Sequence, residues 1–181
     1  MNPRLLYALL SVFVVGADQL TKWLVRRSLE LHEYREVVSG LLSWSHVRNR
    51  GAAFGILSDA DLPYQSALFA SLSLVALGAI VLYARRLPAS ARLPQTALAL
   101  ILGGAVGNLI DRVALGYVTD FVHVFWKHHS WPDFNLADSA ISVGVGLLLL
   151  DMLLSPSPAD DTAPAAKTDN YRPASSVGGA E

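Results

Sequence analysis

The sequence predicts a mainly α-helical membrane protein with four transmembrane helices and a small β element. Hydrophobic residues make up 52% of the 181-residue chain and charged residues only 16%, whereas a soluble domain typically carries about 25% charged residues. The mean hydropathy is +0.39. A helix of about 20 mostly apolar residues crosses the bilayer core, and four such runs occur, at about residues 5–25, 66–83, 94–110 and 137–154. Because the number of spans is even, both termini are expected on the same side of the membrane.

The first run, 5–25, is interrupted near its far end by Asp18 and Lys22. The small residues at 15–17 also allow a cleavable signal peptide. However, apolar residues resume after Lys22, and Asp18 and Lys22 are four apart, where they can pair on one helix face. We therefore expect a retained membrane anchor.

The segments between and after the runs are more polar. In the loop at about 26–65, β-favouring residues alternate around Asn49, Gly51 and Gly55, which indicates a short sheet or hairpin. The connection at 112–136 is polar and rich in aromatic residues and histidine. Residues 155–181 are rich in Pro, Ala, Ser and Asp, so we expect a disordered tail after a single domain at 1–154.

The positively charged residues do not decide the orientation of the spans. Arg85, Arg86 and Arg92 lie in one short connector without an acidic residue, which favours the cytoplasm for that side. The loop after the first run carries five arginines and favours the opposite arrangement. The net charge of −1 gives no reason to expect a nucleic-acid partner.

Alternation of the spans brings most of the intramembrane polar residues to one face. The end of the first run, the end of the third and the start of the fourth all lie there, and ionisable residues at such positions suggest a functional site. This set comprises Asp18, Lys22, Asn108, Asp111, Arg112, Asn135 and Asp138, with Asp120 in the connecting loop. Asp151 lies at the opposite end of the fourth run.

Asp120 and Asp138 are the candidates for a catalytic pair. Two adjacent carboxylates hold one proton between them, which suits them to activate water and to polarise a carbonyl group. The simpler alternative is that Asp138 only caps the fourth helix. Spacing alone leaves both interpretations open.

The remaining candidates also have structural alternatives. Asn108 and Arg112 share a helix face, where they either hold a substrate backbone or form an interfacial ion-pair cluster. The segment at 49–55 either admits a peptide backbone or makes a turn, and Gly103, Gly104 and Gly107 are also typical of close helix packing. The chain has no cysteine and no H-E-x-x-H motif, so we expect neither a metal site nor a cofactor.

Five blocks of the chain, in order, resemble bacterial lipoprotein signal peptidase, or signal peptidase II. They are DQLTK (18–22), NRGAAFG (49–55), GGAVGNLIDR (103–112), VTDF (118–121) and FNLADSAI (134–141). The stretch after Asp120 is more basic and richer in histidine than is usual in that family.

The resemblance implies an aspartic endopeptidase of the bacterial inner membrane with Asp120 and Asp138 as its catalytic pair. Its substrates would be prolipoproteins whose cysteine already carries diacylglycerol, cleaved just before that cysteine, and globomycin-type inhibitors would block it. The resemblance also implies cytoplasmic termini, an active site near the periplasmic face and an extracytoplasmic β cradle in contact with membrane lipid. It assigns substrate binding to Asn49, Gly51, Gly104, Asn108, Arg112 and Asn135, and a supporting role to Asp18, Lys22 and Asp111.

A polytopic transporter or assembly factor is the rival interpretation of the same polar cluster. A transporter is expected to distribute charges through the membrane depth and to contain repeats. The charges here collect at one face, and no internal repeat is visible, which favours the enzyme.

Overall fold

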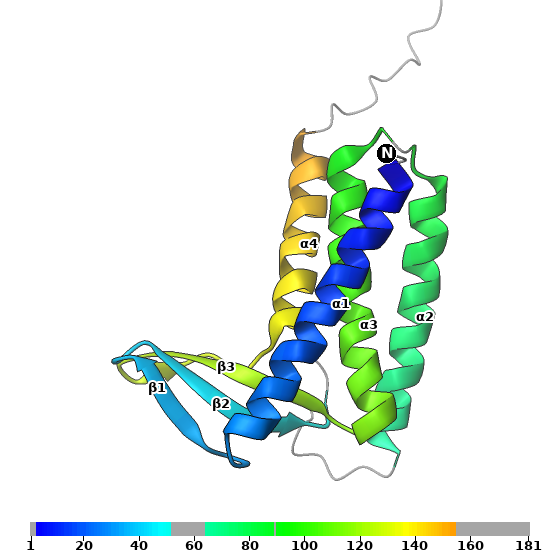
Figure 1. The fold of residues 1–181 in the computed structure, drawn as a ribbon. Helices are drawn as coiled ribbons and strands as arrows, with labels where there is room; N and C mark the ends of the chain where they lie inside the picture. The colour runs from blue at the N-terminus through cyan, green and yellow to red at the C-terminus, as the bar shows by residue number, and fades with distance from the viewer. Residues whose placement is uncertain (1–2, 52–63, 89, 155–181) are drawn as a thin grey trace, which may run out of the picture.

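Four long helices form the body of the protein. The computed structural model describes residues 3–51, 64–88 and 90–154. The helices are α1 (Pro3–Ser28), α2 (Gln65–Arg86), α3 (Arg92–Leu115) and α4 (Leu136–Leu154) (Figure 1). Each is long and apolar enough to cross a membrane, which confirms the four predicted spans. The first three predicted runs are a few residues shorter than the helices, because these helices continue into polar terminal turns, and the fourth differs from α4 by one residue.

The central helix of the bundle is α3, and the other three pack against it. Two glycines allow the closest approaches between α3 and α4. A Cβ atom at Gly104 would meet the carbonyl oxygen of Ala137, and one at Gly144 would lie 2.7 Å from the carbonyl oxygen of Ala97. Small residues therefore set the spacing of these helices, as is common in membrane bundles.

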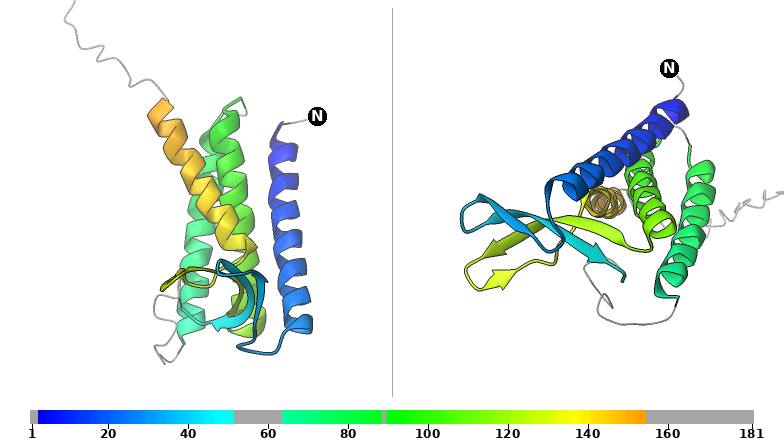
Figure 2. Two further views of the ribbon diagram at one scale, coloured as in Figure 1. Left: turned by 90° about the vertical axis from the view of Figure 1, so that its left-hand side faces the viewer. Right: turned by 60° about the horizontal axis from the view of Figure 1, so that its bottom comes forward.

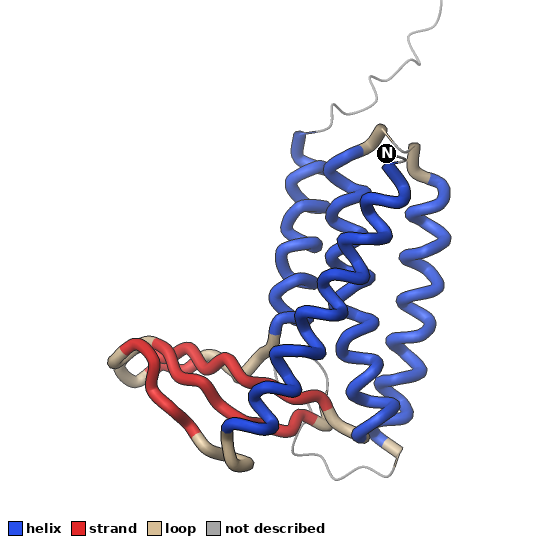
Figure 3. Tube along the Cα trace, in the orientation of Figure 1, coloured by secondary structure: helices blue, strands red, loops and turns tan. Residues whose placement is uncertain are grey.

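A four-stranded antiparallel sheet lies across one end of the bundle. Its strands are β1 (Tyr34–Val38), β2 (Leu42–Asn49), β3 (Val118–Trp126) and β4 (His129–Ser130), in that order across the sheet (Figure 3). The predicted small sheet is confirmed, but the hairpin of β1 and β2 lies before the expected centre at Asn49, Gly51 and Gly55, since β2 ends at Asn49. β3 was not predicted, because the connection at 112–136 has the composition of a polar loop.

The sheet joins two segments that are far apart in the chain. β2, which follows α1, pairs with β3, which follows α3, and the sheet projects sideways from the bundle end (Figures 1 and 2). The start of α1 and the end of α4 lie at the other end of the bundle. Gly55 and the tail at 155–181 fall outside the described residues.

Candidate active site

Asp120 and Asp138 come from different elements that meet where the sheet crosses the bundle. Asp120 lies in β3 and is only 2% exposed, and Asp138 lies in the first turn of α4 and is partly buried. The fold therefore brings together two carboxylates from a strand and a helix.

The β2–β3 ladder positions Asp120. Val47 pairs with Asp120, so Asn49, two residues further along β2, projects from the same face of the sheet. The Asn49 Nδ2 donates a hydrogen bond of 3.0 Å to Asp120 Oδ2, while the Gly51 amide donates to Asn49 Oδ1 at 2.8 Å. The second bond fixes which end of the Asn49 amide faces the carboxylate.

A capping box positions Asp138. The Asp138 amide donates to Asn135 Oδ1 at 2.9 Å, and the Asn135 amide donates to Asp138 Oδ2 at 3.2 Å. These reciprocal bonds are typical of an N-cap residue and the residue three positions later. The helix cap is therefore Asn135, and Asp138 occupies the third helical position, where its other oxygen, Oδ1, lies beside Asn108.

Asn135 also connects the two carboxylates. Its Nδ2 donates to Asp120 Oδ1 at 2.7 Å and to Asn108 Oδ1 at 3.2 Å, and Asn108 Nδ2 donates to Asp138 Oδ1 at 2.8 Å. Each of the four carboxylate oxygens thus accepts a hydrogen bond from a neutral amide. Within the described parts of the chain, no cation forms an ion pair with either carboxylate.

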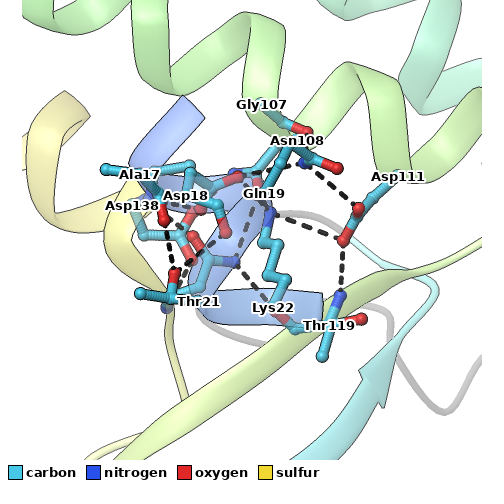
Figure 4. A network of polar contacts seen from close by, with 12 residues as sticks. Ala17, Asp18, Gln19, Thr21, Lys22, Gly107, Asn108, Asp111, Thr119 and Asp138 are labelled. Carbon is cyan, nitrogen blue, oxygen red and sulfur yellow. Dashed lines mark hydrogen bonds and ion pairs between the residues drawn. The ribbon is translucent and has the colours of Figure 1, made fainter. Parts of the chain in front are cut away.

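Lys22 lies behind this pair and is fully buried. Its Nζ donates to Asn108 Oδ1 at 2.8 Å and lies 2.9 Å from Asp18 Oδ2 and 3.4 Å from Asp111 Oδ2 (Figure 4). Because the ammonium group can only donate, it holds the oxygen of the Asn108 amide towards itself and the Asn108 Nδ2 towards Asp138. The predicted pairing of Asp18 with Lys22 is confirmed.

The two carboxylates around Lys22 also tie the elements of the site together. Asp18 Oδ1 accepts a hydrogen bond of 2.9 Å from the Ala137 amide at the start of α4, and Asp111 Oδ2 accepts one of 3.0 Å from the Thr119 amide in β3. A Cβ atom at Gly107 would lie 2.5 Å from Asp18 Oδ2. This cluster therefore links α1 and α3 to the two segments that carry Asp120 and Asp138.

Arg112 borders an open groove beside Asp138. Its Nη2 donates to the Gly51 carbonyl oxygen at 3.1 Å, and its guanidinium lies 5.9 Å from the centre of the Phe69 ring. The groove has a volume of about 330 Å³ and runs between α2, α3 and α4, with Asn108, Arg112 and Asp138 at its polar end and apolar side chains such as Leu72 along its length. This shape suits an extended apolar chain with a polar group at one end.

The environment of Asp120 favours its protonated form. Burial, followed by the nearby charge of Asp138, raises the pKa of Asp120 to about 7, and the hydrogen bonds from Asn49 and Asn135 lower it only in part. Such a pKa suits a group that must exchange a proton near neutral pH.

Comparison with known proteins identifies the family. The family model described as Signal peptidase (SPase) II matches residues 10–154. The chain belongs to the signal peptidase II family. It is 50% identical over 154 residues to the lipoprotein signal peptidase of Geobacter metallireducens, covering 84% of this chain and 94% of that one, and 49% identical over 156 residues to that of Geobacter sulfurreducens, covering 84% and 95%.

The fold also matches that of a solved structure. A bacterial membrane enzyme determined by the in meso method at 2.3 Å resolution superposes with a TM-score of 0.73 at 34% identity, covering 81% of this chain and 87% of that one. The resemblance and the four-helix fold with a small antiparallel sheet are thereby confirmed. The chain is a protease of the membrane, as this family assignment requires.

Among the described residues, Gly104 and Asp151 form no hydrogen bond with the two carboxylates. Gly104 is at the α3–α4 crossing, beside Ala137 and Ile141, where the alternative interpretation as a packing residue accounts for it. Its role in substrate binding stays a prediction. Asp151 lies in the last turn of α4, at the end of the bundle remote from the site.

The sequence analysis missed Asp133, although it lies two residues before Asn135. Asp133 accepts hydrogen bonds from the hydroxyls of Ser45 and, at 3.4 Å, Tyr34, and its Oδ1 lies 3.4 Å from His123 Nδ1. It thus connects β1, β2 and β3 to the segment that enters α4. The only available signal was the unusual histidine content after Asp120, because the partners come from three distant segments.

Proposed function

We propose that this signal peptidase is an aspartic endopeptidase that cleaves diacylglyceryl-modified prolipoproteins just before the lipidated cysteine. One observation carries the proposal: the buried carboxylate of Asp120 and the partly buried carboxylate of Asp138 are both held by Asn135, the first by its side chain and the second by its backbone amide, and the hydrogen-bond donors to both, among the described residues, are neutral amides. The names of the relatives support a lipoprotein precursor as the substrate.

The charges around the site favour a pair that holds one proton. Asp18 and Asp111 contribute two negative charges, and Lys22, Arg26 and Arg112 contribute three positive charges. A carboxylate pair with a net charge of −1 brings this cluster to neutrality, whereas a doubly ionised pair leaves an excess negative charge in a low-dielectric region. The proton belongs to the pair rather than to one residue.

In the proposed mechanism a water molecule between Asp120 and Asp138 attacks the scissile carbonyl carbon. The ionised carboxylate takes one proton from the water, and the protonated carboxyl donates its proton to the carbonyl oxygen, which gives a neutral tetrahedral diol. On its collapse the C–N bond breaks, a diol hydroxyl returns its proton to a carboxylate, and the other carboxyl protonates the leaving amine. The products are a carboxylic acid and an amine, and the pair again holds one proton.

The groove beside Asp138 is the proposed substrate site. Among the described residues, no acceptor satisfies the buried Nε of Arg112, so a substrate carbonyl is a suitable partner. Asn49, Gly51 and Asn135 would approach the peptide backbone from the sheet side. The acyl chains would stay in the bilayer, and globomycin-type inhibitors would occupy the same groove.

The proposed orientation places the active site near the periplasmic face of the bacterial inner membrane. The sheet and the carboxylate pair lie at one bundle end and the start of α1 at the other, so both termini would be cytoplasmic. Arg85, Arg86 and Arg92, which lie at or beside the short α2–α3 connection, support this orientation under the positive-inside rule. In this proposal residues 1–154 form the protease domain.

A cleavage assay with purified protein tests the substrate and the bond. A prolipoprotein with the diacylglyceryl group and the same precursor without it are incubated separately with the purified protein. The masses of the products are measured by mass spectrometry. We expect a single cut before the cysteine of the lipidated precursor only. A cut at another bond, or equal cleavage of the unmodified precursor, contradicts the proposal, and loss of activity with EDTA would indicate metal chemistry.

A further inference from the structure

A second apolar groove lies between α1 and α2 at the bundle end opposite the active site. Its volume is about 190 Å³, and α3 forms its floor. In both views of Figure 2, α1 and α2 stand on different sides of α3. Apolar side chains form the walls, and the basic side chains of Arg4 and Arg85 border it. The wall residues include Ala8, Ile80, Val81, Leu98, Ala99 and Leu102.

Two polar side chains of this groove, Gln95 and Ser11, form hydrogen bonds within the protein. Gln95 is 5% exposed, and its Nε2 donates to the carbonyl oxygens of Ala84 at 3.2 Å and Leu87 at 3.4 Å. Ser11 Oγ donates to the Ala99 carbonyl oxygen at 2.8 Å. These bonds tie α2 and α1 separately to α3, so that the groove is preformed and presents mainly hydrocarbon.

We propose that this α1–α2 groove binds an acidic phospholipid of the surrounding membrane. Arg4 lies in the first turn of α1 and Arg85 in the last turn of α2, and both are exposed at the level where a bilayer changes from hydrocarbon to headgroups. One acyl chain lies against the apolar walls, and the phosphate is held between the two guanidinium groups, which bind phosphate in a bidentate manner. The two arginines lie at the opposite end of the bundle from Asp138, although Ile80 lines both this groove and the groove beside Asp138.

Charge complementarity selects an acidic lipid over a zwitterionic one. The same end of the protein carries Arg86 and Arg92 in addition to the two groove arginines. Among the described residues, the acidic side chain at this end of the bundle is that of Asp151, which belongs to α4 and does not line the groove. An anionic headgroup therefore meets a basic rim, while a choline headgroup adds a cation to it.

Lipid binding by the intact protein in neutral detergent tests this proposal. Dioleoylphosphatidylglycerol and dioleoylphosphatidylcholine share their acyl chains, and native mass spectrometry reports the fraction of protein that carries each lipid. We expect preferential binding of the phosphatidylglycerol. The Arg4→Gln, Arg85→Gln double variant should bind it about 30-fold more weakly, if each arginine near a headgroup contributes as basic residues at membrane surfaces do.

Matched variants separate a defined site from general attraction to a basic surface. Arg86→Gln with Arg92→Gln removes the same charge outside the groove lining and should leave most of the binding intact. Ala8→Phe fills the groove but keeps both arginines, and it should abolish binding, whereas Leu9→Phe on the exposed face of α1 should not.

Several outcomes would overturn the proposal. They are equal binding of the two lipids, equal losses in the groove and control arginine variants, and unchanged binding in Ala8→Phe. Competition by glycerol 3-phosphate would instead indicate a site for a small anion, and a dimer that dissociates in Ala8→Phe would indicate that a second copy of the chain occupies the groove.

Discussion

Replacement of Lys22 by methionine gives a quantitative test of how the site is supported. Lys22 and Asp18 are both 0% exposed, and the Nζ lies 2.9 Å from Asp18 Oδ2 and 3.4 Å from Asp111 Oδ2. Removing one partner of a buried ion pair typically costs about 3–5 kcal/mol, because a buried charge is left uncompensated. We expect Lys22→Met to lower the free energy of unfolding by that amount.

The same geometry predicts which second substitution restores stability. Asp111 keeps Arg26 at 3.8 Å after the loss of Lys22, whereas the described residues offer Asp18 no other cation within ion-pair distance. Asp18→Asn should therefore recover more of the loss than Asp111→Asn does in the Lys22→Met background. The measurement is thermal and denaturant unfolding in detergent, with Lys127→Met at an exposed lysine as the control.

Activity gives a second measure of the same substitution. Without the ammonium group the Asn108 oxygen keeps only the longer hydrogen bond from Asn135 Nδ2, at 3.2 Å, so the amide that donates to Asp138 is held less firmly. We expect Lys22→Met with Asp18→Asn to regain stability but not activity. A loss of less than about 1 kcal/mol in Lys22→Met, or better rescue by Asp111→Asn, would refute the reasoning.

Three further predictions concern the carboxylate pair and its surroundings. The raised pKa of Asp120 means that the folded state binds its proton more tightly, so this residue's contribution to stability is present below its ordinary pKa and is lost as the pH rises through about 7. The thermal unfolding of Asp120→Asn should therefore depend less on pH between 5 and 8 than that of the wild type. An equal pH dependence of the two proteins would contradict this. Gly104→Ala forces a methyl group against Ala137 and should lower the free energy of unfolding by about 1–3 kcal/mol. Gly146→Ala is the control, because open space surrounds Gly146, and it should be neutral or slightly stabilising. Equal effects of the two substitutions would argue against the packing interpretation of Gly104. Asp133→Ala removes two accepted hydrogen bonds and should lower kcat several-fold more than it changes KM, and a change confined to KM would contradict a role in positioning the segment before α4.

Much of the architecture could be predicted from local patterns. Four long apolar runs are a strong signal because each must satisfy its own backbone hydrogen bonds inside the bilayer. Alternation of these runs then placed Asp18, Asn108 and Asp138 at one bundle end without knowledge of their contacts. The alternation of β-favouring residues around Asn49 also predicted a small sheet, although the hairpin lies at 34–49, earlier in the chain than expected.

What the sequence could not provide were the pairings between distant segments. β3 adds to the hairpin only after two helices have crossed the membrane, and its apolar alternation is interrupted by Asp120 and His123. The cap of α4 is Asn135 rather than Asp138, a difference of three residues that composition cannot resolve. The orientation of the Asn108 amide depends on Lys22 from another helix.

The central claim is that Asp120 and Asp138 together activate water, and turnover of three asparagine variants tests it most directly. Cleavage of the diacylglyceryl-modified precursor is measured for Asp120→Asn, Asp138→Asn and Asp151→Asn, the last at the far end of α4, with unfolding curves to show that each variant is folded. Loss of general acid–base catalysis by one positioned group typically costs about 10²–10⁴ in rate. The account predicts a loss of at least this size in each of the first two variants and an unchanged rate in the third. Normal turnover in a folded Asp120→Asn or Asp138→Asn protein would contradict it.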